Sequence, residues 1–415
     1  MKEKKEALLS PVLRWFMFAM VLANISATMS SLLFPLYLNK LGAEITQIGL
    51  VFTIVGVFSL VLQVFGGWVS DSIGRLKAVA IGSIGGVVGV FAVALAPNWQ
   101  LLVVAMVISQ FPRALIGPSF GAFIAENSKE ENRGRVFGAT DMIFTITGIV
   151  GPLLGGFLSD AFNYRFVFWM AAILYTFAAM VRIWMARTMK SAKVEKAKEL
   201  SLKAFGSSVK TLATMILAGG IITWIFVTDG VRDSVYSLSR EIEPLYLQQV
   251  IGLDTKQIGL LWSIFSIAML ATPMLSGKLA DKFGERVPIS AGFLMVFAAY
   301  VIFLTGTSFL PFVFVWSIFG LGVGLLSPAY SSLISKVVPH DRLGAFNGVF
   351  YGSIGLLALP APYLGTLMWE HIGPKSPFVA AAAISLLTII PIWFKFRLPK
   401  EEEKPALVGS PELAE

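Results

Sequence analysis

Long apolar runs follow one another along almost the whole of this chain, and they leave very few folds open to it. Each run is close to the roughly 20 residues that a helix needs to cross a hydrocarbon core about 30 Å thick. Only 14% of the 415 residues are charged, whereas soluble domains carry about 25%. The sequence therefore predicts an all-α membrane protein with twelve transmembrane helices. We expect them at approximately 13–38, 46–70, 78–96, 99–125, 135–160, 165–187, 211–247, 255–278, 287–306, 309–335, 344–368 and 376–396.

The distribution of basic residues predicts how these helices are oriented. Basic loops near the ends of membrane spans are retained on the cytoplasmic side, and most of the 33 Lys and Arg residues fall in the termini and in alternate loops. We therefore expect a multi-pass protein of the cytoplasmic membrane with both termini in the cytoplasm. The lysines before the first run are not followed by a small-residue cleavage site, so this run is expected to be a retained span.

An internal repeat divides the chain into two similar halves. Gly67-Trp-Val-Ser-Asp71-Ser-Ile-Gly74 matches Gly277-Lys-Leu-Ala-Asp281-Lys-Phe-Gly284, and 281 − 71 = 210. The same offset relates Pro118 to Pro328, Gly138 to Gly348, Pro152 to Pro362 and Gly155 to Gly365. This pattern predicts two pseudo-symmetric six-helix bundles that flank a central cavity. They are an N-terminal bundle at 1–187 and a C-terminal bundle at 211–397, with a basic cytoplasmic linker at 188–210 and a disordered cytoplasmic tail at 398–415.

The loop after the second span carries Gly67-x-x-x-Asp71-x-x-Gly74-Arg75. This pattern resembles the loop signature of the major facilitator superfamily of secondary transporters, and the resemblance extends over residues 10–397. It implies a gate-locking charge cluster in which Asp71 latches one conformation, and a plain basic loop is the alternative. Glu126 is expected to pair with Arg133 or Arg135. The predicted gate residues are Gly67, Asp71, Gly74, Arg75, Glu126, Arg133, Gly277, Asp281, Gly284 and Arg286.

Span four carries Arg113-x-x-x-Gly117-Pro118, which is similar to a second signature of that family. Arg113 lies about 14 residues, or roughly 21 Å, into its span. A charge at such a depth costs about 2.5 to 3.5 kcal/mol on insertion scales. We therefore expect Arg113 to face a cavity or a carboxylate, and a purely structural ion pair is the alternative.

Span five contains a run of small residues, Gly148-x-x-Gly151-Pro152-x-x-Gly155-Gly156. This run is similar to the signature of the antiporter branches of the family, which include drug/proton exchangers. Small residues allow close helix packing, and the proline allows a bend. We expect hinge and packing roles for Gly148, Gly151, Pro152, Gly155 and Gly156, and ordinary glycine-rich packing is the alternative.

Span seven carries Asp229, Arg232 and Asp233, whose spacing of i, i+3 and i+4 places them on one helical face. One arginine could then pair with two carboxylates, and such a group can exchange protons when its partner moves. If the span ended near Gly230, these charges would instead be solvated outside the membrane. The predicted substrate and proton pathway comprises Asn24, Phe111, Arg113, Asp141, Trp224, Asp229, Arg232, Asp233 and Trp316.

Several classes of function are disfavoured by the sequence. The chain has no cysteine, and we expect His340 and His371 to be solvated loop residues, so no metal site is predicted. No phosphate-binding loop and no His-Glu-x-x-His site occurs, so an enzyme is not expected. The excess of basic residues is explained by the membrane orientation rather than by nucleic acid.

The expected function is secondary active transport by alternating access, driven by an ion gradient. The resemblance favours proton-coupled efflux of small apolar or cationic compounds, with no cofactor other than the coupling proton. A symporter or facilitator for a metabolite or an organic anion is the alternative, with Arg113 and Arg232 as anion contacts. The expected partners are a small-molecule substrate and membrane lipid, and the chain is expected to work as a monomer.

Overall fold

The computed structural model describes residues 9–188, 214, 219–338 and 343–397, and these form helices joined by short turns. Residues 189–210 of the predicted linker at 188–210, the predicted tail at 398–415 and His340 lie outside the described residues. The first half comprises α1 Pro11–Ser31, α2 Leu33–Lys40, α3 Ile45–Ile73, α4 Arg75–Leu95, α5 Trp99–Ile108, α6 Gln110–Glu126, η1 Glu130–Asn132, α7 Arg133–Ala161 and α8 Tyr164–Thr188. The second half comprises α10 Ile221–Arg240, α11 Glu243–Tyr246, η2 Leu247–Ile251, α12 Thr255–Leu270, α13 Pro273–Phe283, α14 Arg286–Thr305, α15 Phe309–Val337, α16 Leu343–Ala358, α17 Ala361–His371 and α18 Ser376–Lys395.

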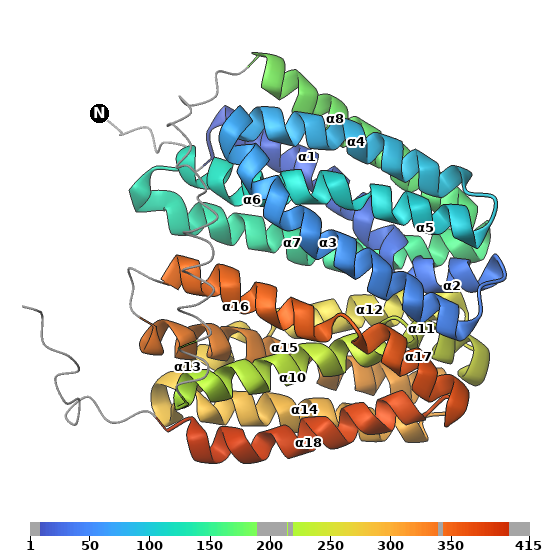
Figure 1. The fold of residues 1–415 in the computed structure, drawn as a ribbon, viewed down its shortest axis with the longest axis vertical. Helices are drawn as coiled ribbons and strands as arrows, with labels where there is room; N and C mark the ends of the chain where they lie inside the picture. The colour runs from blue at the N-terminus through green and yellow to red at the C-terminus, as the bar shows by residue number, and fades with distance from the viewer. Residues whose placement is uncertain (1–8, 189–213, 215–218, 339–342, 398–415) are drawn as a thin grey trace, which may run out of the picture.

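The two halves form separate bundles that lie one above the other in Figure 1. Within the first bundle α1 packs against α7 and α8, and α4 packs against α6 and α8. Within the second bundle α14 packs against α15 and α18, and α10 packs against α18. The bundles touch mainly through α7 with α12 and α3 with α17. The predicted all-α fold with two bundles is therefore confirmed.

The number of spans is close to the predicted twelve without matching it. Ten helical segments in the described part of the chain are long and apolar enough to cross a membrane, and the bent pair α12 and α13 makes eleven. The helix α10 does not pass that test, because Asp229, Arg232 and Asp233 fall within one stretch of it. Its continuation through α11 and η2 makes it the candidate for the remaining span, so the count of twelve stays a prediction.

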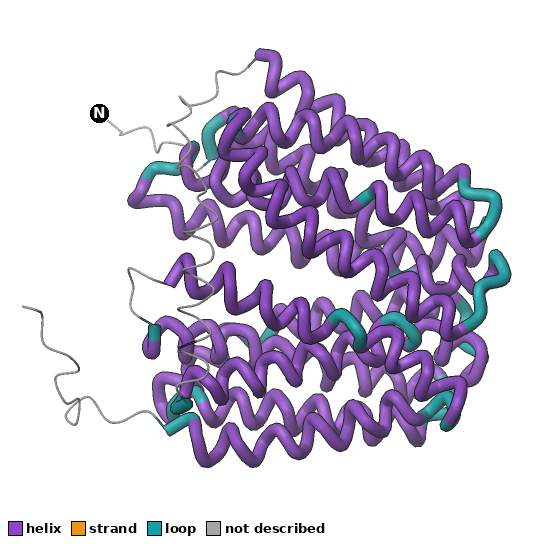
Figure 2. Tube along the Cα trace, in the orientation of Figure 1, coloured by secondary structure: helices purple, strands orange, loops and turns teal. Residues whose placement is uncertain are grey.

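The bundles are joined at only one end of the molecule in Figures 1 and 2. We call this the joined end, where α2 and α11 lie, and we call the opposite end, where α1 begins and α8 ends, the terminal end. Hydrogen bonds between the halves connect Gln249 to Asn39 (2.8 Å), Gln248 to Tyr164 (2.9 Å), Thr46 to Glu370, Thr53 to the carbonyl of Leu359 (3.1 Å) and Ser263 to the carbonyl of Ile149 (2.7 Å). In Figure 2 the helices of the two halves diverge from these contacts toward the terminal end.

Glycines allow the close approach of the bundles at the joined end. A Cβ built at Gly156 would lie 3.1 Å from the Cα of Gly259, and a Cβ at Gly56 would lie 3.0 Å from the side chain of Leu359. Side chains larger than hydrogen would therefore push the halves apart. This is the packing mode expected for membrane helices, where small residues replace a hydrophobic driving force.

Candidate functional site

The turns after α3 and α13 have the same backbone conformation, as the repeat predicts. Gly74 has φ 91° and ψ 146°, and Gly284 has φ 82° and ψ 159°. Residues with a side chain rarely adopt a positive φ of this kind, so glycine is required at both turns. Gly67 and Asp71 lie in α3, and the surroundings of both residues are outside the described part of the structure.

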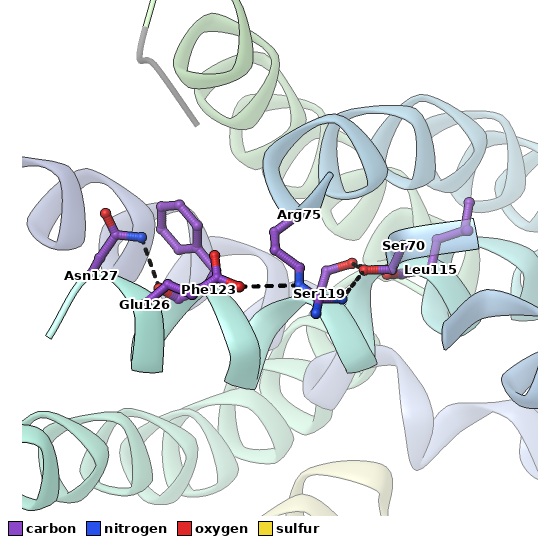
Figure 3. A network of polar contacts seen from close by, with 7 residues as sticks. All are labelled: Ser70, Arg75, Leu115, Ser119, Phe123, Glu126 and Asn127. Atoms are coloured by element: carbon purple, nitrogen blue, oxygen red, sulfur yellow. Dashed lines mark hydrogen bonds and ion pairs between the residues drawn. The ribbon is translucent and has the colours of Figure 1, made fainter. Parts of the chain in front are cut away.

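Arg75 ties the first of these turns to the end of α6. Its Nε lies 3.4 Å from Oε1 of Glu126, and its Nη1 donates to Oγ of Ser70 at 3.0 Å. Figure 3 shows this network, in which Ser70 and Ser119 are also hydrogen-bonded at 2.6 Å. The expectation that Glu126 pairs with Arg133 or Arg135 was wrong, because the turn after α3 brings Arg75 to the end of α6 while Arg133 begins the next helix.

The second half repeats this ion pair with its charges reversed. Nζ of Lys336 lies 2.5 Å from Oε1 of Glu285, which also accepts from Oγ of Ser332 at 3.0 Å. Glu285 and Lys336 occupy the positions of Arg75 and Glu126, because 285 − 75 and 336 − 126 both equal 210. Glu285 is 2% exposed, so it depends on these two partners. Both pairs therefore fasten a turn to a neighbouring helix of the same half.

The remaining predicted gate residues lie at the terminal end. Arg133 is the first residue of α7 and is exposed, and Asp281 is exposed in the last turns of α13. The guanidinium of Arg286 lies 5.0 Å from the ring centre of Trp393. The aromatic face of Trp393 stabilises that cation without a carboxylate.

Two arginines of the first half lie within its apolar helices, Arg113 in α6 and Arg182 in α8. Arg182 is 5% exposed, its Nη1 donates to Oγ of Ser83 at 3.4 Å, and the hydroxyl of Tyr175 lies nearby. Arg113 is exposed, and it lies close enough to Tyr175 and to Arg240 of the second half for their charges to interact. It therefore faces the region between the halves. Arg113 makes no hydrogen bond or ion pair with any residue that the structure describes.

The structure brings together the three charged residues predicted on span seven. Nη2 of Arg232 lies 2.9 Å from Oδ1 of Asp229 and 3.8 Å from Oδ1 of Asp233. Asp229 is 1% exposed, because α10 continues to Arg240 and packs against α16 and α18. The helix therefore does not end near Gly230, and the depth of these charges in the membrane stays a prediction. The Arg232 guanidinium also lies 5.4 Å from the ring centre of Tyr330, whose hydroxyl donates to Thr228 at 2.9 Å.

A second group of charges lies where span seven bends, and the sequence analysis missed it. Nε of Arg240 lies 3.8 Å from Oε1 of Glu241, and its guanidinium lies 5.3 Å from the ring centre of Tyr236. Glu243 is 8% exposed in the next turn. The signal that could have revealed this group is Glu241-x-Glu243 directly before Pro244, well before the apolar run ends.

The other predicted pathway residues are not gathered around these charges. Trp316 is 2% exposed and packs against Phe303 and Phe312 inside the second half, so it does not line a passage in this conformation. The ring of Trp224 lies 5.8 Å from Nζ of Lys395, and Asn24 donates to the carbonyl of Met20 in its own helix at 2.9 Å. Phe111 and Asp141 are exposed.

The glycines of span five pack α7 against two neighbours. A Cβ at Gly151 or Gly155 would overlap Thr28 or Met29 of α1, while Gly156 and Pro152 face Gly259 of α12 across the interface between the halves. Oγ of Ser266 donates to the carbonyl of Gly148 at 3.0 Å across the same interface. Close packing is thus visible at these residues, and the hinge role stays a prediction.

The sequence matches a known family over nearly all of its length. The model described as Major Facilitator Superfamily matches residues 16–239 and again residues 236–413. The chain belongs to the Major Facilitator Superfamily. Members of this family are transporters rather than enzymes, so the chain is a multi-pass membrane transporter of small molecules. The first of the two successive matches extends into α10 of the second half, so together they support the family over the whole chain without dividing it at the boundary between the bundles.

Curated relatives of this family member include bacterial efflux pumps. The chain is 24% identical to the Multi-drug resistance efflux pump PmrA homolog of Lactococcus lactis, over 88% of this chain and 89% of that protein. It is 22% identical to the Quinolone resistance protein NorA of Staphylococcus aureus, over 86% and 89% of the two chains. It is 23% identical to the uncharacterized MFS-type transporter YttB of Bacillus subtilis, over 93% and 97%.

Solved structures share the fold of this family member. A crystal structure of the peptide transporter POT in complex with sulfate has a TM-score of 0.72 at 15% identity, and the match covers 92% of this chain and 93% of that one. The human organic anion transporter MFSD10 (TETRAN) has a TM-score of 0.63 at 14% identity, with 92% and 100% covered. At this identity the likeness concerns the fold alone.

In the described residues, no group of three or more His, Asp or Glu side chains could hold a metal ion.

Proposed function

We propose that this transporter exports small apolar or cationic compounds across the cytoplasmic membrane in exchange for protons. Efflux is supported by relatives whose names describe multidrug and quinolone resistance. Proton coupling is supported by one observation above all, the ion pair between Asp229 and Arg232 inside α10 with Asp233 beside it. Two carboxyls that share one guanidinium carry an excess negative charge, which a proton or a cationic compound can neutralise.

The orientation that we propose places the terminal end in the cytoplasm, because described basic residues at helix ends, such as Arg75, Arg133 and Arg286, lie there. The conformation described here would then be open to the cytoplasm and closed on the outside. A compound could reach Arg113 and the carboxyls of α10 from the cytoplasm, and closure of the terminal end would follow. This sequence of events is alternating access about a site between two parallel repeats.

The test is uptake of the cationic dye ethidium into proteoliposomes with an imposed pH gradient. Wild-type protein should move the dye against its own gradient, and collapse of the pH gradient should abolish this movement. Asp229→Asn should lower gradient-driven uptake at least tenfold, while Asp160→Asn, an exposed carboxyl of the same type at the end of α7, should leave it unchanged. Dye flux that ignores the pH gradient in wild-type protein would contradict the proposal.

A second candidate function is favoured by Arg113, which has no ion-pair partner among the residues that the structure describes. It and Arg182 give the first half two positive charges whose described neighbours are hydroxyls and another arginine. Guanidinium groups bind carboxylate and phosphate groups well, so a facilitator or symporter for an organic anion would use them. In that case Asp229→Asn should leave downhill exchange of an anion such as benzoate intact, while Arg113→Gln should abolish it.

A further inference from the structure

The bend of span seven is enclosed by protein on several sides. The helix α10 ends at Arg240, and α11 begins at Glu243 before Pro244. Ile242 and Leu245 are buried, and the ring of Tyr246 packs against Phe303 and Phe378. The charged residues of the bend are therefore held between two helical pieces, and Glu243 points into protein rather than into bulk water.

The bend contains two carboxyls for one guanidinium. Arg240 lies beside Glu241, and Oε1 of Glu243 has no hydrogen-bond partner among the described residues. Burying an ionised carboxylate without a partner costs several kcal/mol, and a bound proton removes most of that cost. The bend therefore has two carboxyls and one guanidinium, as do Asp229, Arg232 and Asp233. Its Glu243 Oε1 makes no hydrogen bond to a described residue, so this oxygen can bind a proton.

Groups from three elements face this cluster. Tyr236 and Arg240 come from α10, and Tyr300 of α14 lies near Glu243, with its hydroxyl 2.8 Å from that of Ser239. Arg113 comes from the first half and lies within electrostatic reach of Arg240. A positive charge of the first half thus lies near the charged cluster of the second half. Movement of one half relative to the other would therefore change the electrostatic potential at Glu243.

We propose that Arg240, Glu241 and Glu243 form a second proton-binding site, separate from Asp229, Arg232 and Asp233. The proton binds to Glu243 while Arg113 is distant, and it leaves when movement of the first half brings the Arg113 guanidinium toward the cluster. Each transport cycle then moves two protons, one for each pair of carboxyls. This inference rests on the proposed proton-coupled function and adds its stoichiometry.

The experiment counts the protons released when ethidium binds to the purified protein in a weakly buffered solution with a pH indicator. Wild-type protein should release two protons for each bound dye, and Glu243→Gln should release one while still binding the dye. The control Glu130→Gln changes an exposed carboxyl in η1 and should release two. If Glu243→Gln does not fold, Glu241→Gln removes the same excess charge and should also release one.

The possible outcomes separate this inference from the function on which it rests. Release of two protons by Glu243→Gln would overturn the second site and leave the transporter proton-coupled. No release by wild-type protein, together with ethidium uptake that ignores the pH gradient, would overturn the proposed function itself.

A second inference comes from the register of the helices that join the halves. At four contacts between the halves the facing residues have numbers that add up to 415. They are Gly156 of α7 with Gly259 of α12, Gly49 of α3 with Thr366 of α17, and further along α3 Gly56 with Leu359 and Leu60 with Gly355 of α16. Each pair of helices therefore runs antiparallel in one continuous register. Extended toward the terminal end, the same register places Gly138 of α7 opposite Gly277 of α13.

Gly138 and Gly277 do not touch in this structure. A Cβ built at either residue has no described atom within 4 Å. The chain bends by 40° between α12 and α13, around Ala271 and Thr272, and this bend directs α13 away from the line of α12. Two glycines that face open space would allow the same close contact as Gly156 and Gly259 if the bend straightened.

We propose that α7 and α13 close the terminal end by straightening the bend at Ala271–Thr272, with Gly138 packed against Gly277. The natural absence of cysteine makes this directly testable. In the variant Gly138→Cys/Gly277→Cys, a mild oxidant should form a disulfide, transport should stop, and a reductant should restore it. The control Gly138→Cys/Lys278→Cys turns the second thiol by about 100° around the helix and should cross-link at least tenfold more slowly.

Equal rates of cross-linking in the two double-cysteine variants would overturn this register. So would the absence of cross-linking in Gly138→Cys/Gly277→Cys, both with and without ethidium. Both positions lie in open space, so the substituted protein should fold as the wild type does. Elution of each variant as a single peak in size-exclusion chromatography checks this point.

Discussion

The ion pair between Asp229 and Arg232 gives the most quantitative prediction. Replacing Arg232 with glutamine leaves Asp229, which is 1% exposed, without the guanidinium that lies 2.9 Å away. Breaking a buried pair in this way costs about 3 to 5 kcal/mol. Because Arg232 is itself 26% exposed, water can reach the site in part, and we expect about 3 kcal/mol.

The reciprocal change should be milder. Asp229→Asn leaves Arg232 with Asp233, whose Oδ1 is 3.8 Å away and whose side chain is 44% exposed. A partly solvated cation with a remaining partner costs little, so we expect about 1 kcal/mol. The double variant removes both charges, and its loss should be about 2 kcal/mol smaller than the sum of the two single losses.

The measurement is the free energy of unfolding of detergent-solubilised protein in a double-mutant cycle, followed by tryptophan fluorescence. Arg187→Gln, at the exposed end of α8, is the control for loss of an arginine and should change stability by less than about 0.5 kcal/mol. Equal, small and additive losses for the two single variants would refute the reasoning, because they would mean that Asp229 is neutral or solvated without Arg232.

Three further changes follow from contacts in the structure. Lys336→Gln should destabilise the protein by about 1.5 to 3 kcal/mol in the same unfolding assay, because Glu285 is 2% exposed and loses its counter-ion. Gly86→Ala should cost about 1 to 3 kcal/mol, because the added Cβ would overlap the hydroxyl of Tyr175. Gly259→Ala should loosen the joined end, since its Cβ would overlap a backbone carbonyl of α7, and faster hydrogen exchange in α7 and α12 would show it.

The repeat explains why so much of the fold could be predicted. Identities at a constant offset of 210 indicated two bundles, and Gly74 and Gly284 indeed both have a positive φ, of 91° and 82°. The reversed ion pairs were missed because only identical residues were compared. Arg75 and Glu285 differ in charge, and so do Glu126 and Lys336, yet each pair occupies equivalent positions. A comparison that also scored exchanged charges would have found them.

Buried charges could be predicted only where several occur close together. Asp229, Arg232 and Asp233 form a recognisable helical face, whereas Arg182 is a single arginine within an apolar run. The polar groups near it are the hydroxyls of Tyr175 in its own helix and of Ser83 in α4, and no local pattern reveals the latter. The end at which the two halves contact one another could not be predicted either, because the repeat relates the halves without specifying which ends of their helices touch.

The charges of the interior are divided unequally between the halves, and this division has a consequence for exchange. The first half contributes two arginines, and span seven contributes two arginines and four carboxyls. With all four carboxyls ionised these groups carry no net charge, and with two protons bound they carry two positive charges. A cationic compound about 8 Å from each added charge would be repelled by about 2 kcal/mol per charge at an effective dielectric constant of about 20. Protons and a cation therefore exclude one another from this interior, and such exclusion is the physical requirement for exchange rather than for symport.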